Sequence, residues 1–185
     1  SAWTPPAKPL TDPAQDANTG ATGVDYPIGA PQPVRWVVSN TGRTWLTAIT
    51  LADTTTGGPD VGAWTCDLTA VGGPAAYSFA TSGPWAGPLA PGASFFCQGP
   101  LTLPENTKHA DTVAVDGTVV QPAYDADGQP LLDPNGVPRY AVDAGGNPVA
   151  SSIVVTDTDP FNAQTVKVSI AKGDGVGGQI TNDAD

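Results

Sequence analysis

Proline and glycine occur so often in this chain that long helices are excluded. The 185 residues include 20 prolines and 22 glycines. A proline inside a helix removes a hydrogen bond and clashes with the preceding turn, and a glycine costs about 1 kcal/mol relative to alanine. The stretches between these residues are rich in Val, Thr, Ile, Trp and Phe, which suit a pleated, half-buried surface. The sequence therefore predicts an all-β protein.

Alternation of apolar and polar residues marks the expected strands. Residues 34–40 alternate and end at an Asn-Thr-Gly turn in which Gly42 can adopt a positive φ, and residues 44–51 would form the second strand of a hairpin. Further short runs follow at intervals of about ten residues, which is typical of an Ig-like β-sandwich. They are expected at residues 63–68, 76–80, 95–103, 109–115 with 118–121, 153–156 and 165–170.

One segment differs from the rest of the chain. Residues 124–149 repeat a unit three times, in which an Asp is followed by small residues, a Gly, any residue, a Pro and an apolar residue. Each copy predicts a tight turn that leads into a short extended stretch. We therefore expect a β-meander inserted into the sandwich around residues 117–150. Residues 125–128 resemble the start of an EF-hand loop, but no glutamate follows at the required distance, so turn chemistry is the preferred interpretation.

The two cysteines, Cys66 and Cys97, bear on both stability and environment. The chain has no CxxC pair and one histidine, so a metal site built on thiolates is not indicated. A single disulfide is the simplest interpretation, and the alternative is a pair of buried free thiols. A disulfide would place the protein outside a reducing cytosol and stabilise it by about 3–4 kcal/mol in the chain-entropy model.

The net charge argues against several classes of partner. It is −11, with 7 Lys and Arg against 18 Asp and Glu. Such a surface repels phosphate backbones and anionic lipids, so neither nucleic acid nor a membrane surface is an expected partner. No apolar run approaches the roughly 18 residues of a membrane-spanning helix, and we expect no membrane insertion.

The two ends of the chain carry similar residues, which indicates a tandem repeat. An offset of 164 residues aligns four identical pairs: Ala7 with Ala171, Lys8 with Lys172, Gln15 with Gln179 and Asn18 with Asn182. We expect residues 1–171 to form one Ig-like sandwich repeat that includes the insert. Residues 172–185 would then be a linker or the start of the next repeat.

A series of motifs carries a resemblance to a known family. In chain order they are Val-Val-Ser-Asn-Thr-Gly at residues 37–42, Leu…Ile-Thr-Leu-Ala-Asp at 46–53, Leu-Ala-Pro-Gly-Ala-Ser-Phe-Phe-Cys at 89–97, Val-Thr-Asp-Thr-Asp-Pro at 155–160, Ile-Ala-Lys-Gly-Asp at 170–174 and Asn-Asp-Ala-Asp at 182–185. Together they resemble the conserved-repeat domains of bacterial surface proteins, Ig-like relatives of the CnaB and SdrD B-type modules. The long segment between the cysteines and the insert depart from that pattern.

The resemblance implies secretion, a cell-wall or envelope tether elsewhere in the parent chain, and a mechanical role at the cell surface. We therefore expect a structural stalk repeat of a bacterial adhesin or fibrillar protein, monomeric as an isolated module, whose partners are neighbouring repeats of the same chain. The alternative is a ligand-binding adhesin module that recognises a glycan, a protein or an environmental surface through its long loops.

Groups suited to catalysis are scarce. His109 is the only histidine, and no Gly-x-Ser-x-Gly elbow accompanies it, so a hydrolytic triad is not indicated and His109 is expected at the surface or at a strand edge. Glu105 is the only glutamate, and the aspartates lie mostly in turns, where they bond their own backbone. We expect no enzymatic activity and no required cofactor.

Calcium is the cation that the acidic residues would suit, because it binds several carboxylate and carbonyl oxygens at about 2.3–2.6 Å. The candidate ligands are Asp157 and Asp159 at the end of a strand, and a C-terminal cluster of Asp174, Asn182, Asp183 and Asp185. A cation there would stiffen the joint between repeats, whereas the alternative is a solvated acidic linker.

The resemblance also points to a covalent cross-link as a candidate feature, since related modules carry Lys–Asn isopeptide or Thr–Gln ester bonds. An isopeptide needs a desolvated, neutral lysine beside a protonated carboxyl group. Lys172 continues the face of Val166, Val168 and Ile170 and could point inward, and Lys8 is its counterpart. The candidate acceptors are Asn162 and Asn182.

Four tryptophans could lie either in the core or on an exposed surface that binds a ligand. Trp36 and Trp45 share strand faces with apolar residues and are expected in the core. Trp64 and Trp85 lie in Gly/Pro-rich loops and are the candidates for an exposed carbohydrate platform.

Overall fold

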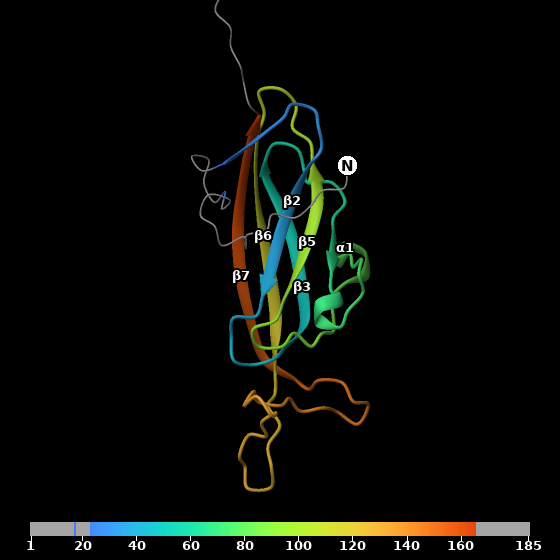
Figure 1. Ribbon diagram of the computed structural model, residues 1–185, viewed down its shortest axis with the longest axis vertical. Coiled ribbons are helices and arrows are strands. Elements are labelled where there is room, and N and C mark those ends of the chain that lie inside the picture. The colour runs from blue at the N-terminus through green and yellow to red at the C-terminus, as the bar shows by residue number, and fades with distance from the viewer. Residues whose placement is uncertain (1–16, 18–22, 166–185) are drawn as a thin grey trace, which may run out of the picture.

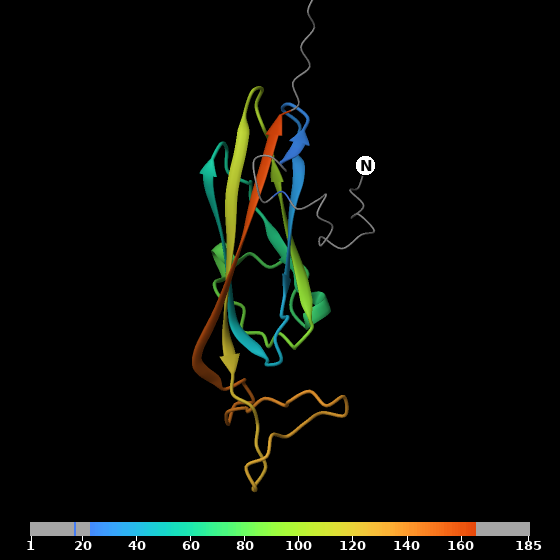
Figure 2. The same ribbon diagram turned by 90° about the vertical axis from the view of Figure 1, so that its left-hand side faces the viewer.

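The computed structural model describes residue 17 and residues 23–165, which form two β-sheets packed face to face (Figures 1 and 2). The first sheet has the order β1 (Val24–Tyr26), β7 (Ala150–Thr165), β6 (Lys108–Val120), β3 (Leu46–Gly57). The second has the order β2 (Gln32–Ser39), β5 (Ser94–Leu101), β4 (Thr65–Asp67). In this part of the chain the helical elements are η1 (Thr69–Val71) and α1 (Phe79–Ser82), and none is long and apolar enough to span a membrane. The predicted all-β sandwich is confirmed.

Alternate side chains of each strand form the core between the sheets. Along β2, Val34, Trp36 and Val38 are buried, and the residues between them are not, because successive side chains of a strand point to opposite faces. Ile49 and Leu51 of β3 belong to the same buried cluster from the facing sheet. Burial of these apolar side chains is the main source of stability in such a sandwich.

The hairpin predicted from residues 34–51 does not form. β2 pairs with β5 and β3 pairs with β6, so the two strands lie in different sheets. The Asn-Thr-Gly segment is instead a connection between the layers. Asn40 is buried there, and its side-chain amide donates hydrogen bonds to the carbonyl oxygens of Thr44 at 2.8 Å and Leu89 at 3.1 Å. The sequence Asn-Thr-Gly suits a hairpin turn and also suits a connection between sheets in which the asparagine is buried. The hairpin prediction was therefore wrong although the turn residues were read correctly.

The strand order is that of an Ig-type sandwich with one position changed. Such domains place strands A, B, E and D in one sheet and C, F and G in the other. Here β2, β5 and β4 correspond to B, E and D, and β3, β6 and β7 correspond to C, F and G. β1 pairs in parallel with the end of β7, where Val24 lies opposite Ala163. In the described part of the chain, the outer edge of β2 therefore has no neighbouring strand.

The predicted disulfide between Cys66 and Cys97 is present. The two residues lie directly opposite each other in β4 and β5, and both are fully buried. The bond therefore joins neighbouring strands of one sheet, and it closes a loop that contains η1 and α1. The strand predicted at residues 76–80 is reduced to a single bridge between Tyr77 and Cys66 because residues 79–82 form α1.

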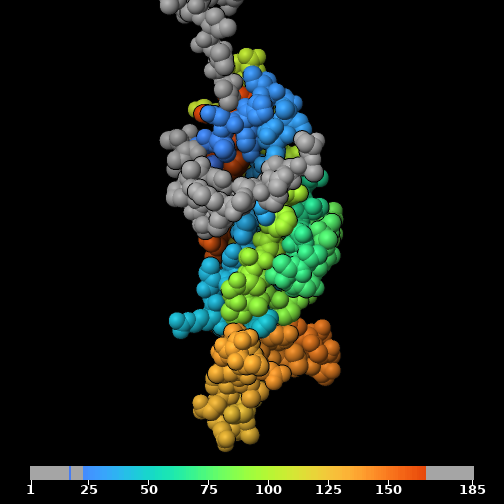
Figure 3. Space-filling view, viewed as in Figure 1, coloured from blue at the N-terminus to red at the C-terminus, as the bar shows by residue number. Residues whose placement is uncertain are grey.

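The insert occupies residues 121–149, rather than 117–150, because β6 continues to Val120 and β7 begins at Ala150. It projects beyond the sandwich at the end opposite β1 (Figure 3). Each of its three turns is fixed by an aspartate whose Oδ1 accepts two backbone N–H groups at 2.8–3.0 Å: Asp125, Asp133 and Asp143. Trp45, expected in the core, is half-buried beneath the insert, where its indole N–H donates to Pro138 O at 2.8 Å and its ring packs on Tyr140.

Candidate functional site

A groove runs along the flank of the sandwich between β2 and β7. Its volume is about 550 Å³. The floor is apolar and includes Trp36, Ile49, Val113 and Val115, while residues 37–42 with Thr44 form one wall and residues 155–159 of β7 form the other. We call this feature the flank groove.

The flank groove is open because strand edges on both of its sides lack neighbours among the described residues. β2 is the outermost strand of its sheet. β1 covers β7 only from Ala163 to Thr165, so the edge of β7 before that point is bare. Both faces of β7 are also exposed along residues 152–160. Bare edges with exposed apolar residues are templates for pairing with another strand.

Apolar side chains on this stretch of β7 are unusually accessible. Ile153 and Val154 are each 58% exposed and Val155 is 44% exposed. Side chains of a strand alternate between faces, so Val154 faces outward and Val155 faces the other sheet. Only Val155 lines the flank groove.

Asp157 and Asp159, predicted as calcium ligands, lie on the wall of the flank groove. They pair with Val115 and Val113, whose side chains line the floor, so both aspartates are on the inner face of β7. An inner face is normally apolar, but both aspartates are exposed to solvent at this bare part of the strand.

The rest of the predicted calcium set lies outside the described residues. This holds for Asp174, Asn182, Asp183 and Asp185, and equally for the cross-link candidates Lys172 and Lys8. Among residues 17 and 23–165, no three His, Cys, Asp or Glu side chains gather in a way that could hold a metal ion. Asn162, a candidate cross-link acceptor, donates its side-chain amide to Ala17 O at 2.9 Å.

Trp36, a residue of the groove floor, also carries a buried polar group, its indole N–H. Trp36 is 6% exposed, and this N–H has no hydrogen-bond acceptor among the residues described. Its ring contacts Trp64 edge to face at 5.4 Å. A buried donor without an acceptor is rare and costs free energy.

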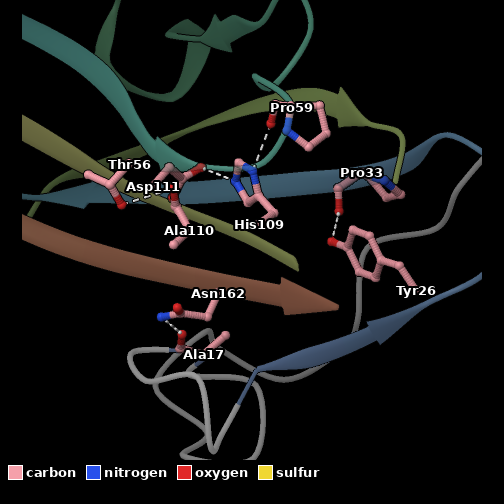
Figure 4. Close-up of polar contacts among 9 residues, drawn as sticks. All are labelled: Ala17, Tyr26, Pro33, Thr56, Pro59, His109, Ala110, Asp111 and Asn162. Atoms are coloured by element: carbon pink, nitrogen blue, oxygen red, sulfur yellow. Dashed lines mark hydrogen bonds and ion pairs between the residues drawn. The ribbon is translucent and has the colours of Figure 1, made fainter. Parts of the chain in front are cut away.

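A second polar cluster lies inside the sandwich near β1 (Figure 4). His109 and Asp111 of β6 point into the core and are fully buried, so the expectation that His109 lies at the surface or at a strand edge is wrong. Nδ1 of His109 is 2.8 Å from Pro59 O, and Nε2 is 2.8 Å from Oδ2 of Asp111. The signal in the sequence was the alternation of His109, Asp111 and Val113 on one strand face.

The partners of His109 fix its protonation. A carbonyl oxygen can only accept, so Nδ1 must carry a proton that it donates to Pro59 O. The short contact between Nε2 and Asp111 requires a second proton, and an imidazolium paired with a carboxylate supplies it. Burial alone lowers the pKa of His109, but the hydrogen bond and charge of Asp111, with smaller contributions from Pro59 and Asp53, raise the pKa above its usual value.

Two neighbouring groups respond to the same cluster. Burial, followed by the charge of Asp111, raises the pKa of Asp53 on β3 to about 6. Burial and the charge of Asp111 also raise the pKa of Tyr26 to about 12, and its hydroxyl donates to Pro33 O at 3.2 Å. These groups connect β1, β2, β3 and β6 at one end of the sandwich.

Gly58 allows the Pro59 carbonyl to reach His109. Its φ is +82°, and a Cβ at this position would lie 2.2 Å from Lys108 O. Only glycine adopts this conformation and this close approach without strain. The cluster therefore depends on backbone geometry that no charge pattern in the sequence predicts.

Of the tryptophans predicted as a ligand platform, Trp85 belongs to the core and Trp64 packs against it. Trp85 is 7% exposed and packs edge to face on Phe95 at 6.0 Å. Trp64 is half-buried between Trp36 and Phe79. Trp85 is therefore not exposed as a platform would require, whereas Trp64 is only partly covered.

Comparison with protein-family models, with curated proteins and with solved structures found no significant match to this chain.

Proposed function

We propose that this chain is a structural stalk repeat of a secreted bacterial protein tethered to the cell surface. The observation that carries the proposal is the parallel pairing of β1 with β7. β7 runs along the long axis of the molecule (Figure 1), and β1 runs in the same direction beside its last residues. A chain that enters through β1 and leaves through β7 can therefore be pulled along that axis with its first and last strands side by side.

This geometry suits a unit that carries force. Pulling the two strands in opposite directions along their axes loads the hydrogen bonds between them together, in shear. The register from Val24↔Ala163 to Tyr26↔Thr165 sets the length of that contact. The side chains of Gln164 and Asp25 add a hydrogen bond of 3.0 Å across the same pair of strands. The buried cluster of His109 and Asp111 supports β6, which pairs with β7 over most of its length.

The disulfide supports both the location and the role. Such bonds persist in oxidising compartments, which fits a secreted protein. The bond between Cys66 and Cys97 spans 31 residues of sequence. If the unit unfolds under load, the closed loop withholds roughly 100 Å of extended chain, at about 3.3–3.6 Å per residue. The resemblance of residues 37–42, 89–97 and 155–160 to surface-protein repeats supports the same conclusion.

The alternative is a ligand-binding module, and the insert is the feature that favours it. Tyr124, Leu132 and Val142 are 54–58% exposed on a segment that projects from one end of the sandwich. Such apolar groups can bind a glycan or a protein surface. They are spread over three separate turns, however, rather than gathered at one place.

Single-molecule pulling tests the proposal. The chain is placed in series with reference domains of known mechanical strength and extended with and without a reductant. A stalk repeat should give a distinct unfolding peak, and reduction should lengthen the extension per unit by roughly 100 Å. Unfolding without a resolvable peak, together with a ligand found on glycan or protein arrays, would favour the binding module instead.

A further inference from the structure

The flank groove has the properties of a site that accepts a β-strand. Its floor is apolar, and the edge of β2 beside it is bare among the described residues. An Ig-type sandwich has strand A at the edge that β2 leaves bare. We propose that the flank groove binds residues 166–172 of a second copy of this chain as an added strand next to β2.

The sequence of residues 166–172, Val-Lys-Val-Ser-Ile-Ala-Lys, fits the groove. Val166, Val168 and Ile170 alternate with polar or small residues, as required of a strand with one buried face. These three side chains would cover the apolar floor. Lys172 lies on the same face and would meet the inner-face carboxyl groups of Asp157 and Asp159. A buried charge needs such a partner.

The direction of the strands explains why the partner must be another copy. β2 and β7 run in opposite directions (Figure 1), so a strand antiparallel to β2 runs the same way as β7. Val166 follows directly on Thr165, the last residue of β7. The groove lies beside residues 155–159. Six to ten residues of strand separate these positions, roughly 20–33 Å. Residues 166–172 would have to double back to lie there in their own molecule.

The chain's own residues 1–16 are the competing occupant. They precede Ala17, whose carbonyl oxygen accepts a hydrogen bond from Asn162, three residues beyond the part of β7 that lines the groove. The sequence disfavours them because prolines stand at positions 5, 6, 9 and 13. Proline has no N–H to donate to a neighbouring strand. At the offset of 164 residues, Ala2–Lys8 is the counterpart of 166–172, and Pro5 and Pro6 stand where the other has Ser169 and Ile170.

Association of this kind is head to tail. Each copy would give its C-terminal segment and receive that of another, so the contact does not close on itself. This inference deepens the proposed stalk function by naming a partner for the unit. The pulling experiment uses covalently linked units, so it can succeed when association fails.

Sedimentation of the full chain and three variants tests the inference. Val155→Asp places a charge in the acceptor groove, Val168→Asp places one in the donor strand, and Val154→Asp is the matched control on the outer face of β7. Wild type and Val154→Asp should form larger species as concentration rises, whereas Val155→Asp and Val168→Asp should each remain monomeric. Circular dichroism should show the same folded spectrum for all four proteins.

Mixing the two monomeric variants is the decisive step. Val155→Asp keeps an intact donor strand and Val168→Asp keeps an intact groove, so an equimolar mixture should give a one-to-one dimer that grows no further. A labelled peptide of residues 165–173 should also bind Val168→Asp and not Val155→Asp. A mixture that stays monomeric, a wild type that never associates, or loss of association in Val154→Asp would overturn the inference.

Discussion

The imidazole Nε2 of His109 lies 2.8 Å from Oδ2 of Asp111, and neither side chain is accessible to solvent. This pair is the most deeply buried ionic contact in the described part of the molecule. It connects β6 to the loop after β3, because the other ring nitrogen donates to Pro59 O. The arrangement leads to two predictions about stability.

Breaking the pair should destabilise the fold strongly. Asp111→Leu leaves the imidazole buried without its acceptor, and removal of one partner of a buried pair costs about 3–5 kcal/mol. The double variant His109→Leu/Asp111→Leu should recover most of that loss, because an apolar pair can replace a buried ionic one. Urea unfolding measures both. Asp127→Leu on the exposed insert is the control and should change little. Equal stability of wild type and Asp111→Leu would contradict the assignment.

Stability should fall as the pH rises from about 5 to 8. Asp53 has a folded pKa of about 6, above its ordinary 3.8. The folded state therefore keeps a proton that the unfolded state releases, and stability is lost as the pH rises through 6. His109, whose pKa is also raised, continues the loss above its ordinary 6.5. Hydrogen bonds from Thr69 and Asn147 lower the pKa values of Asp67 and Asp143. These two groups make the fold less stable as the pH falls, but only at pH values below the ordinary 3.8 of an aspartate.

The variant Asp53→Asn isolates the carboxyl contribution. It should flatten the pH dependence between 4 and 6 by about 1 kcal/mol, a modest figure because this half-exposed group is screened by water. Thermal unfolding at constant ionic strength provides the measurement. Wild type that is more stable at pH 8 than at pH 5 would be the opposite of what these groups require.

Removing the disulfide should weaken the unit without changing its topology. Cys66→Ala/Cys97→Ala opens a loop of 31 residues and should cost about 3–4 kcal/mol. The apolar cluster around Phe79 and Phe95 would still hold the loop against the sheet. Guanidinium unfolding of the variant and of oxidised wild type gives the difference. A loss below about 1 kcal/mol would mean that the loop is held by packing alone.

The insert should be dispensable for folding. Val120 pairs with Ala150, so an Asn-Gly turn in place of residues 121–149 would join β6 to β7 as a simple hairpin. The loss should be about 1–2 kcal/mol, because the contacts that disappear are those of Trp45 with Tyr140 and Pro138 and an exposed hydrogen bond from Gln121 Nε2 to Ala150 O. Urea unfolding and the near-ultraviolet spectrum report on this. A variant that fails to fold would show that the insert is part of the core.

Local patterns in the sequence predicted the fold class but not how strands pair. The alternation of Val34, Trp36 and Val38 identified a strand with one buried face, and the two cysteines identified the disulfide. The hairpin failed because a turn sequence does not say whether the next strand joins the same sheet. In this protein the partner of β2 is β5, about sixty residues further along the chain, and only the packed structure reveals it.

The candidate sites were harder to predict for the same reason. Asp157 and Asp159 were found from their acidity, but their place on the inner face follows from the register with Val115 and Val113. The flank groove exists because no described strand pairs with the outer edge of β2. No short sequence pattern indicates that a strand edge will lack a neighbour. Trp85 lies in a loop rich in glycine and proline, and its burial depends on the bridge from its backbone to Ile49 in β3.

The pairing of β1 with β7 is the contact on which the stalk interpretation depends. In a parallel ladder, the N–H and C=O of one residue point to the neighbouring strand and those of the next residue point away. Proline at the residue that faces β7 therefore removes a hydrogen bond of the sheared contact, and proline at the adjacent residue does not. Val24→Pro and Asp25→Pro form that matched pair.

Pulling both variants beside wild type, with equilibrium stability measured in parallel, tests this most directly. One of the two variants should unfold at a clearly lower force than wild type. Its loss of equilibrium stability should nevertheless be no larger than the loss in the other variant. If all three proteins unfold at the same force, the β1–β7 contact does not carry the load and the stalk interpretation loses its structural basis.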